Sequence, residues 1–210
     1  MDGYLVPAKA AETEFTEKRS RFIGHIFPAG TEAEALAALK KTRETHWDAN
    51  HNVYAYLIKD GPTRYSDDSE PQGTAGMPVL DVLRRREVTN LLCVVTRYFG
   101  GVLLGAGGLV RAYARSASDA LDAAGLARMQ AWRHVDVPCP YALLARVKTA
   151  VERGGGLVLE TEYAAGVLVH AMFPAARTEE FLAALTDLTN GTVAGEPGET
   201  EYRAFPLEAD

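Results

Sequence analysis

Residues 90–125 read NLLCVVT, RYFGGVLLGAGG and LVRAYARSASDALDAAG in succession. The first piece, residues 90–96, is almost continuously apolar, which is typical of a strand buried on both faces of a sheet. In the last piece apolar residues recur at helical spacing and Gly125 follows them, which predicts an amphipathic helix that ends there. Five of the chain's 19 glycines lie between Gly100 and Gly108. The sequence therefore predicts a central strand that enters a helix through a glycine-rich loop.

The glycine-rich loop (residues 97–108) has a composition suited to binding an anion. Glycine lets backbone amides approach an anion at a helix N-terminus, and Arg97 and Arg111 add positive charge. The spacing matches neither a P-loop nor a dinucleotide fingerprint. A tight bend in which glycine permits close packing and positive φ is the alternative explanation. The candidate residues for binding a nucleotide phosphate, RNA or a partner are Arg97, Tyr98, Gly100, Gly101, Gly105, Gly107, Gly108, Arg111 and Tyr113.

A second loop, the acidic loop (residues 66–76), reads SDDSEPQGTAG. Its three carboxylates could hold a divalent cation or supply a general base, although the spacing is not that of an EF-hand. Alternatively, the aspartates make Asx turns and Thr74 caps the next helix. His51 could reach this loop if its strand is a neighbour, or could simply bond to backbone. The candidate polar site comprises His51, Asp67, Asp68, Glu70 and Thr74, and neither a metal nor a cofactor is assigned to it.

The remaining pattern predicts an α+β protein of two domains. Upstream, it predicts strands over 4–6, 14–17, 21–27 and 53–58, a polar loop over about 63–76, and a helix beginning near Pro78. It also predicts a helix to about residue 46 that begins with a capping box of Thr31 and Glu34. Downstream, it predicts a strand over 129–137, a helix over 141–153, strands over 157–163 and 166–173, a helix over 178–188, and a strand from 193 to 205. The downstream order, βαββαβ, is that of a ferredoxin-like domain. We therefore expect domains at residues 1–125 and 126–210.

Composition and charge limit the function classes. The 47% hydrophobic fraction is enough for a buried core, and no apolar run approaches the roughly 18–20 residues that span a bilayer. Two cysteines, Cys93 and Cys139, do not make a disulfide scaffold, so we expect a reduced, cytoplasmic protein without a membrane partner. Residues 1–125 hold 15 Lys/Arg against 16 Asp/Glu, whereas residues 126–210 hold 7 against 12. The net charge of −6 therefore belongs mostly to the second domain and does not exclude a polyanion site in the first.

The acidic loop (66–76) and residues 95–113, which contain the glycine-rich loop, resemble the two diagnostic blocks of the YigZ/IMPACT family. KRSRFI (18–23) and ANHNVYAY (49–56) also match elements of that family, while Ser69 stands where glycine is usual and Met77 where a basic residue is common. The resemblance is strong over about the first 125 residues, and the remainder is similar to the family's smaller second domain. It implies an N-terminal domain like the second domain of ribosomal protein S5. It also implies a C-terminal, ferredoxin-like domain like the last domain of a translocation factor.

The family resemblance directs the expected function toward translation. Eukaryotic relatives restrain a stress-activated kinase of translation initiation by competing for its ribosome-associated activator, and bacterial two-domain relatives have no firmly assigned activity. We therefore expect a noncatalytic, translation-associated regulator that binds RNA, the ribosome or a ribosome-bound protein. One alternative is a metal-dependent enzyme or binder of a phosphorylated small molecule or nucleotide, with Asp67, Asp68 and Glu70 on the metal and His51 assisting. Another is a protein-interaction module whose acidic second domain engages a basic partner.

Overall fold

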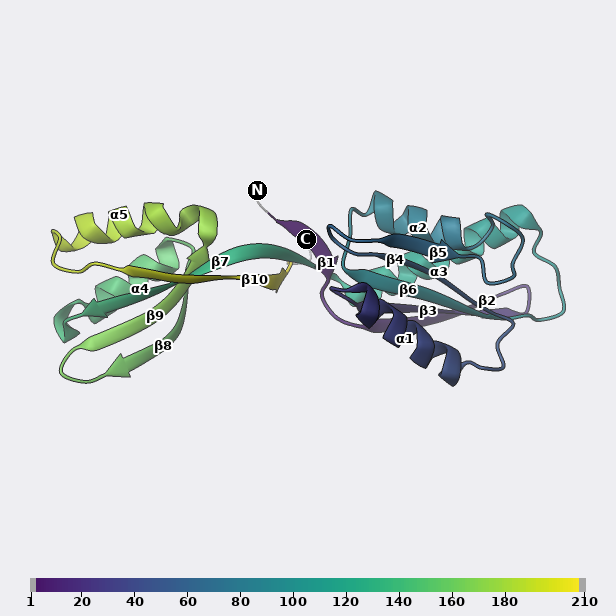
Figure 1. Cartoon of the computed structure of the whole chain (residues 1–210), viewed down its shortest axis with the longest axis horizontal. Coiled ribbons are helices and arrows are strands. Elements are labelled where there is room, and N and C mark those ends of the chain that lie inside the picture. Colours follow the sequence, from purple (N-terminus) through teal and green to yellow (C-terminus); the bar gives the residue numbers. More distant parts are fainter. Residues whose placement is uncertain (1–2, 208–210) are drawn as a thin grey trace. The chain divides into compact units, whose positions relative to one another are not determined.

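The computed structural model describes residues 3–207, which divide into two compact units. Residues 4–128 with 204–207 form the N-terminal unit, and residues 129–203 with Gly3 form the C-terminal unit. Each unit combines an antiparallel sheet with helices, so the chain is a two-domain α+β protein (Figure 1). Both cysteines, Cys93 and Cys139, are buried and free. Within residues 3–207, no helix is both long and apolar enough to cross a membrane.

The N-terminal unit contains a five-stranded sheet in the order β2-β3-β6-β4-β5. Neighbouring strands in this sheet are all antiparallel. The apolar run after Asn90 becomes the middle strand, β6, as its composition predicts. The strands are β2 (Ala11–Glu17), β3 (Ser20–Pro28), β4 (His51–Leu57), β5 (Thr63–Ser66) and β6 (Leu91–Tyr98).

Three helices cover the two faces of this sheet (Figure 1). Successive residues of a strand point to opposite faces, and β6 follows this rule. Cys93 and Val95 pack in the core formed with α2 and α3, whereas Leu92 and Val94 pack in the core formed with α1. The helices are α1 (Glu32–Thr45), which begins with the expected Thr31/Glu34 capping box, α2 (Gly76–Arg85) and α3 (Ala106–Ala124). Both faces of β6 are therefore buried, as predicted.

Two expectations about the segment before α2 are wrong. Residues 63–66 form β5 beside β4 rather than part of a loop, because four residues are too few for a strand period to be recognised. Thr74 does not cap α2, because its hydroxyl donates to the carbonyl of Pro71 at 2.6 Å. The carboxylate of Asp67 accepts from the amides of Ala75 and Gly76 instead, at 3.1 and 2.8 Å. A negative charge suits the positive end of the helix dipole better than a hydroxyl does.

The C-terminal unit has the predicted βαββαβ order. Its sheet order, β10-β7-β9-β8, is that of a ferredoxin-like domain. The short strand β1 (Tyr4–Pro7) belongs to the N-terminal unit. Valines of β7 and β9 pack against apolar residues of α4 and α5, including Phe181. The likeness of the N-terminal unit to ribosomal protein S5 stays a prediction. The elements are β7 (Leu126–Cys139), η1 (Tyr141–Leu143), α4 (Leu144–Arg153), β8 (Leu157–Tyr163), β9 (Val167–Pro174), η2 (Ala175–Arg177), α5 (Thr178–Thr189) and β10 (Glu196–Pro206).

Candidate functional site

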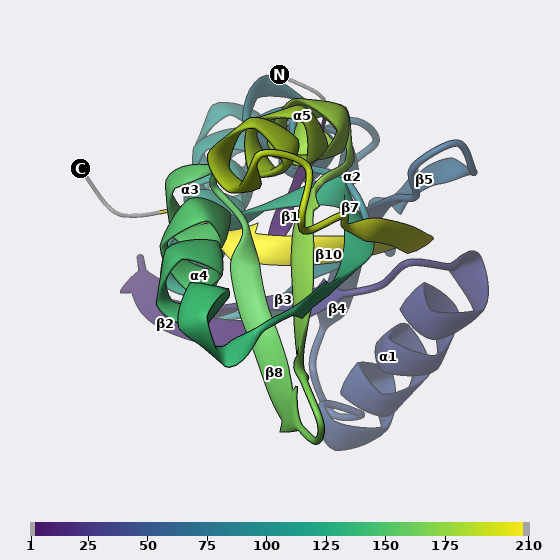
Figure 2. The ribbon, with the colours of Figure 1, turned by 90° about the vertical axis from the view of Figure 1, so that its left-hand side faces the viewer.

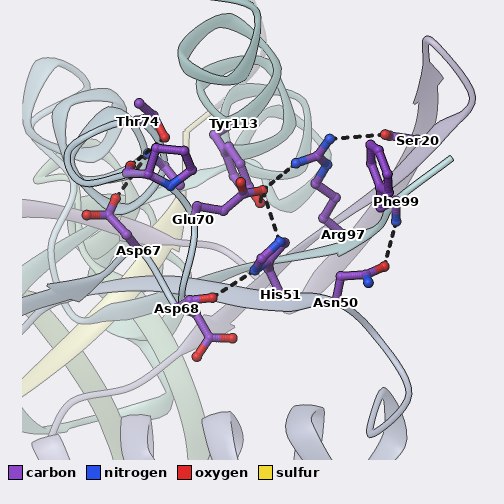
Figure 3. A network of polar contacts seen from close by, with 12 residues as sticks. Ser20, Asn50, His51, Asp67, Asp68, Glu70, Thr74, Arg97, Phe99 and Tyr113 are labelled. Atoms are coloured by element: carbon purple, nitrogen blue, oxygen red, sulfur yellow. Dashed lines mark hydrogen bonds and ion pairs between the residues drawn. The ribbon is translucent and has the colours of Figure 1, made fainter. Parts of the chain in front are cut away.

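The glycine-rich loop and the acidic loop meet at one end of the N-terminal sheet. The strand register places His51, the first residue of β4, opposite Arg97, the penultimate residue of β6. Glu70 of the acidic loop contacts both of them and Tyr113 of α3 (Figure 3). A hollow of about 380 Å³ lies beside this cluster and is lined by residues of both loops. The two candidate sites of the sequence are therefore neighbours around one hollow.

Glu70 is the centre of a buried polar network. Its Oε1 accepts hydrogen bonds from Nη1 of Arg97 at 2.6 Å and from the hydroxyl of Tyr113 at 2.7 Å. Nη2 of Arg97 also donates to the hydroxyl of Ser20 at 3.2 Å. Burial, and next the adjacent Glu70 carboxylate, raise the pKa of Tyr113 well above its usual value. The network thus joins β3, the acidic loop, β6 and α3 and neutralises the charge of the glutamate.

Arg97 holds the glycine-rich loop in place. Its guanidinium carbon lies 5.4 Å from the ring centres of both Phe22 and Phe99. The amide of Phe99 in turn donates to Oδ1 of Asn50 at 2.7 Å. The expectation that Arg97 offers free charge to a ligand does not fit this arrangement, because the residue is only 4% exposed and paired with Glu70. Position 97 lies on the same face of β6 as positions 93 and 95, the face that packs against α2 and α3, which explains the burial of Arg97.

His51 contacts the acidic loop, as the sequence suggested it could. Its Nδ1 lies 2.8 Å from the carbonyl oxygen of Asp68, and because a carbonyl only accepts, Nδ1 carries a proton. Nε2 lies 3.7 Å from Oε1 of Glu70, and the residue lines the hollow. In the neutral ring, Nε2 therefore carries the lone pair, and it becomes a donor when the ring is protonated.

The aspartates of the acidic loop bind protein groups. Asp67 accepts from the amide of Gly73 at 2.9 Å in addition to the two amides at the start of α2. Asp68 accepts from the amide of Asn52 at 2.6 Å and from Nη2 of Arg43 at 3.2 Å. Within residues 3–207 there is no group of three or more His, Cys, Asp or Glu that could hold a metal ion. Asp67 and Asp68 therefore attach the acidic loop to α2, β4 and α1. The Asx turns and the metal-dependent alternative stay predictions.

The glycines of the glycine-rich loop differ in the structural constraint that requires a glycine. A Cβ atom on Gly100 would lie 2.0 Å from the carbonyl oxygen of Arg19, so the backbone approach allows no side chain there. Gly105, the residue before α3, has a φ of +75°. Gly107, in the first turn of α3, has neither constraint: its nearest neighbour would be a guanidinium nitrogen of Arg111 at 3.5 Å. Close packing and turn geometry therefore explain Gly100 and Gly105 but not Gly107.

A smaller hollow of about 150 Å³ lies on the other side of Leu104 and carries positive charge. Three cations, Lys18, Arg111 and Arg115, line it together with Gly108 and one acidic residue, Glu17. Arg115 is paired with an aspartate four residues further along α3. Lys18 and Arg111 are exposed, and neither makes a hydrogen bond or ion pair with another residue of the described chain. Free cations are therefore available here rather than at Arg97.

Sequence reasoning did not include Lys18 and its neighbour Arg19 among the site residues. Both have positive φ, +45° and +65°, in the two-residue turn that joins β2 to β3. Asparagine and glycine are the usual residues in such turns, so two cations with positive φ are unusual and store some strain. A lysine–arginine pair between two short alternating strands was the signal that could have identified them.

Comparison with known proteins places these hollows within a known domain. Residues 18–121 match the Impact N-terminal domain, and residues 137–192 match DUF1949, a domain of unknown function. The chain is 36% identical over 204 residues to the IMPACT family member YvyE of Bacillus subtilis, covering 96% of this chain and 94% of the relative. This chain belongs to the IMPACT family. Most residues around both hollows lie inside the Impact N-terminal match.

Other IMPACT proteins match either most of this chain or less than half of it. YigZ of Escherichia coli is 33% identical over 197 residues, covering 92% of this chain and 97% of the relative. Protein IMPACT of Oryctolagus cuniculus is 38% identical over 96 residues, covering 43% of this chain and 30% of that protein. The crystal structure of a hypothetical protein has a TM-score of 0.60 with this chain at 31% identity, covering 100% of both chains. The family predicted from the sequence is confirmed.

Proposed function

We propose that this IMPACT-family protein is a noncatalytic regulator of translation that binds ribosomal RNA through the face around the start of α3. The observation that carries the proposal is the pair of unpartnered cations, Lys18 and Arg111, in the hollow beside Gly108. Two such charges next to a helix N-terminus attract a phosphate group. Because RNA and ribosomes occur in the cytoplasm, the proposal places the protein there.

The first turn of α3 adds backbone donors to these charges. The first amides of a helix have no partner within the helix, and the positive end of the helix dipole lies there. No side chain caps α3, and Gly105 precedes it. A Cβ atom on Gly105 would have no heavy atom within 4 Å, so the backbone is open at this point. A phosphate oxygen can therefore approach the amides of residues 106–108 while Arg111 and Lys18 balance its charge.

The larger hollow has exposed apolar side chains that suit a nucleotide base rather than an isolated phosphate. Phe99 is 42% exposed and Leu103 is 81% exposed, and both line this hollow with His51. A flat aromatic side chain near a phosphate site is suited to stacking against an unpaired base. A face with free cations, helix amides and an exposed ring favours RNA over a free phosphate. The noncatalytic part of the proposal is supported by Glu70 and Arg97, which are both buried and form an ion pair with each other.

Cosedimentation of the full chain with ribosomes at low salt tests the proposal. The double variant Lys18→Glu/Arg111→Glu should lose binding, because it reverses two charges at the face without touching the buried network. The matched control is Arg64→Glu/Arg84→Glu, which makes the same charge change at two exposed residues outside both hollows. Wild-type protein that stays in the supernatant at low salt would rule the proposal out. Equal loss in the control would show that only net charge matters and would also contradict it.

A further inference from the structure

Helices α4 and α5 belong to the C-terminal unit (Figure 2). Residues of both helices line a groove of about 560 Å³. Small residues line it on both sides, including Ala145 and Thr149 of α4 and Ala184 of α5. Packed helices normally fill the space between their axes with larger side chains that interdigitate. Here the small residues leave the space open toward solvent, while Phe181 lies buried at its base and stacks on Phe173 with ring centres 3.9 Å apart. The groove therefore has an apolar floor.

The charge of the groove is opposite to that of its domain. Residues 126–210 contain seven Lys/Arg and twelve Asp/Glu. Three of those seven cations line the groove, namely Arg146, Arg153 and Arg177, whereas Glu180 is the one acidic residue in the lining. Arg146 donates a hydrogen bond to the carbonyl of Leu188 at 3.0 Å and so satisfies a carbonyl in the last turn of α5. Arg153 is exposed and has no hydrogen bond or ion pair with another described residue.

Two of the arginines lie at the same end of the groove. Arg153 is the last residue of α4, and Arg177 directly precedes α5. A Cβ atom on Gly155 would lie 2.5 Å from Nη1 of Arg177, so the guanidinium occupies the space above this glycine, just beyond Arg153. The positive end of the α5 dipole is at this end too, and no side chain caps it. The charge is therefore concentrated where α4 ends and α5 begins.

We propose that this groove binds a small amphipathic anion. The anionic group, a carboxylate, sulfonate or phosphate, is held by Arg153 and Arg177, and the apolar body lies against Ala150, Phe181 and Ala184. A mostly apolar cavity with a few convergent polar groups is the usual form of a small-molecule site, and the volume falls within the common range of about 300–1,000 Å³. Charge complementarity selects an anion, because only Glu180 opposes the arginines and it lies 3.7 Å from Arg177. The inference does not depend on RNA binding by the N-terminal unit.

Binding of two defined probes to the full chain tests this inference. 8-Anilinonaphthalene-1-sulfonate is titrated by fluorescence, and dodecanoate is added as a competitor, with dodecanol as its uncharged counterpart. We expect saturable binding of one dye per chain, displacement by dodecanoate, and about tenfold weaker displacement by dodecanol, as expected for loss of one charge-assisted contact. Amide resonances of residues 149–154 and 177–184 should shift on addition of dodecanoate.

Paired variants separate the groove from the rest of the surface. Arg153→Glu and Ala184→Trp should each weaken dye binding about tenfold or more, because one reverses the charge and the other fills the cavity. Lys148→Glu on α4 and Ala183→Trp on α5 make the same changes outside the groove lining and should leave binding unchanged. If Ala184→Trp fails to fold, Arg153→Glu decides alone. Absence of saturable dye binding to the wild-type chain overturns the inference, as does binding that survives Arg153→Glu or moves to other resonances.

Discussion

Oε1 of Glu70 lies 2.6 Å from Nη1 of Arg97, and the two side chains are only 4% and 5% exposed. This ion pair joins a loop between β5 and α2 to the end of the central strand β6. Because it accepts a second hydrogen bond from Tyr113, the carboxylate also fixes α3 against both. The face at the start of α3 is therefore built on a buried ion pair rather than on a mobile loop.

Replacing Glu70 should destabilise the protein strongly. Glu70→Gln keeps the shape of the side chain but leaves Arg97 buried without a counter-charge, which we expect to cost about 3–5 kcal/mol of unfolding free energy. Urea denaturation measures this difference. The control is Glu14→Gln, which breaks the exposed ion pair to Arg21 and should cost far less stability, because solvent screens that pair. Similar costs for the two variants would contradict the assigned role of the buried pair.

Replacing Asp67 should loosen the acidic loop. Asp67→Ala removes the acceptor of three backbone amides, those of Gly73, Ala75 and Gly76, and should cost about 1–3 kcal/mol. Hydrogen exchange at these three amides should accelerate more than exchange in β6. Asp119→Ala, which removes an exposed carboxylate paired with Arg115, serves as the control. Unchanged protection of the three amides would show that Asp67 does not hold the loop.

Gly107→Ala should separate stability from binding. Alanine is favoured over glycine inside a helix by about 0.5–1 kcal/mol, and a Cβ atom at this position meets no close neighbour, so the melting temperature should rise. RNA affinity should nevertheless fall, because the new methyl group obstructs the approach to the first turn of α3. Gly100→Ala provides the contrast: it forces a contact with the carbonyl of Arg19 and should destabilise the fold. Unchanged RNA affinity in folded Gly107→Ala would count against the proposed approach of the phosphate.

His170 should make the stability of the C-terminal unit depend on pH. Its hydrogen bond to Asp136, and to a smaller extent Glu162, raises the pKa of His170 above its ordinary value of 6.5. The stabilisation is then fully present below about pH 6.5 and is lost as pH rises through the raised pKa. His170→Gln should thus cost more stability at pH 6 than at pH 9, as measured by urea denaturation. An equal cost at both values, or an NMR titration midpoint for His170 at or below 6.5, would contradict this.

The sequence predicted the elements better than their contacts. The apolar run of β6, the stripe of α3 and the capping box of α1 each depend on neighbouring residues, and each is confirmed. β5 was missed because its four residues carry too little periodicity. The βαββαβ order was visible because glycines and prolines separate its elements.

The alternative in which the acidic second domain engages a basic partner stays a prediction.

The candidate site was predicted only in part. His51 was expected to reach the acidic loop on the condition that strand and loop are neighbours, and the pairing of β4 with β5, which leads into the loop, makes them so. The pairing of Arg97 with Glu70 could not be predicted, because it depends on which face of β6 residue 97 occupies. The availability of Lys18 and Arg111 depends equally on which cations find no partner in the folded chain. Composition gives the number of charges but not their pairing.

The central claim is that an RNA phosphate binds at the start of α3 with Lys18 and Arg111 as its free cations. The most direct measurement is the affinity of the full chain for a single-stranded RNA oligonucleotide, taken by fluorescence anisotropy across a salt series for wild type, Lys18→Glu/Arg111→Glu and Arg64→Glu/Arg84→Glu. We predict that Lys18→Glu/Arg111→Glu binds at least about tenfold more weakly than wild type at low salt. Its slope of log affinity against log salt should be shallower by about 1–2, while Arg64→Glu/Arg84→Glu should retain the wild-type slope. The same affinity and slope for Lys18→Glu/Arg111→Glu as for wild type would contradict the claim.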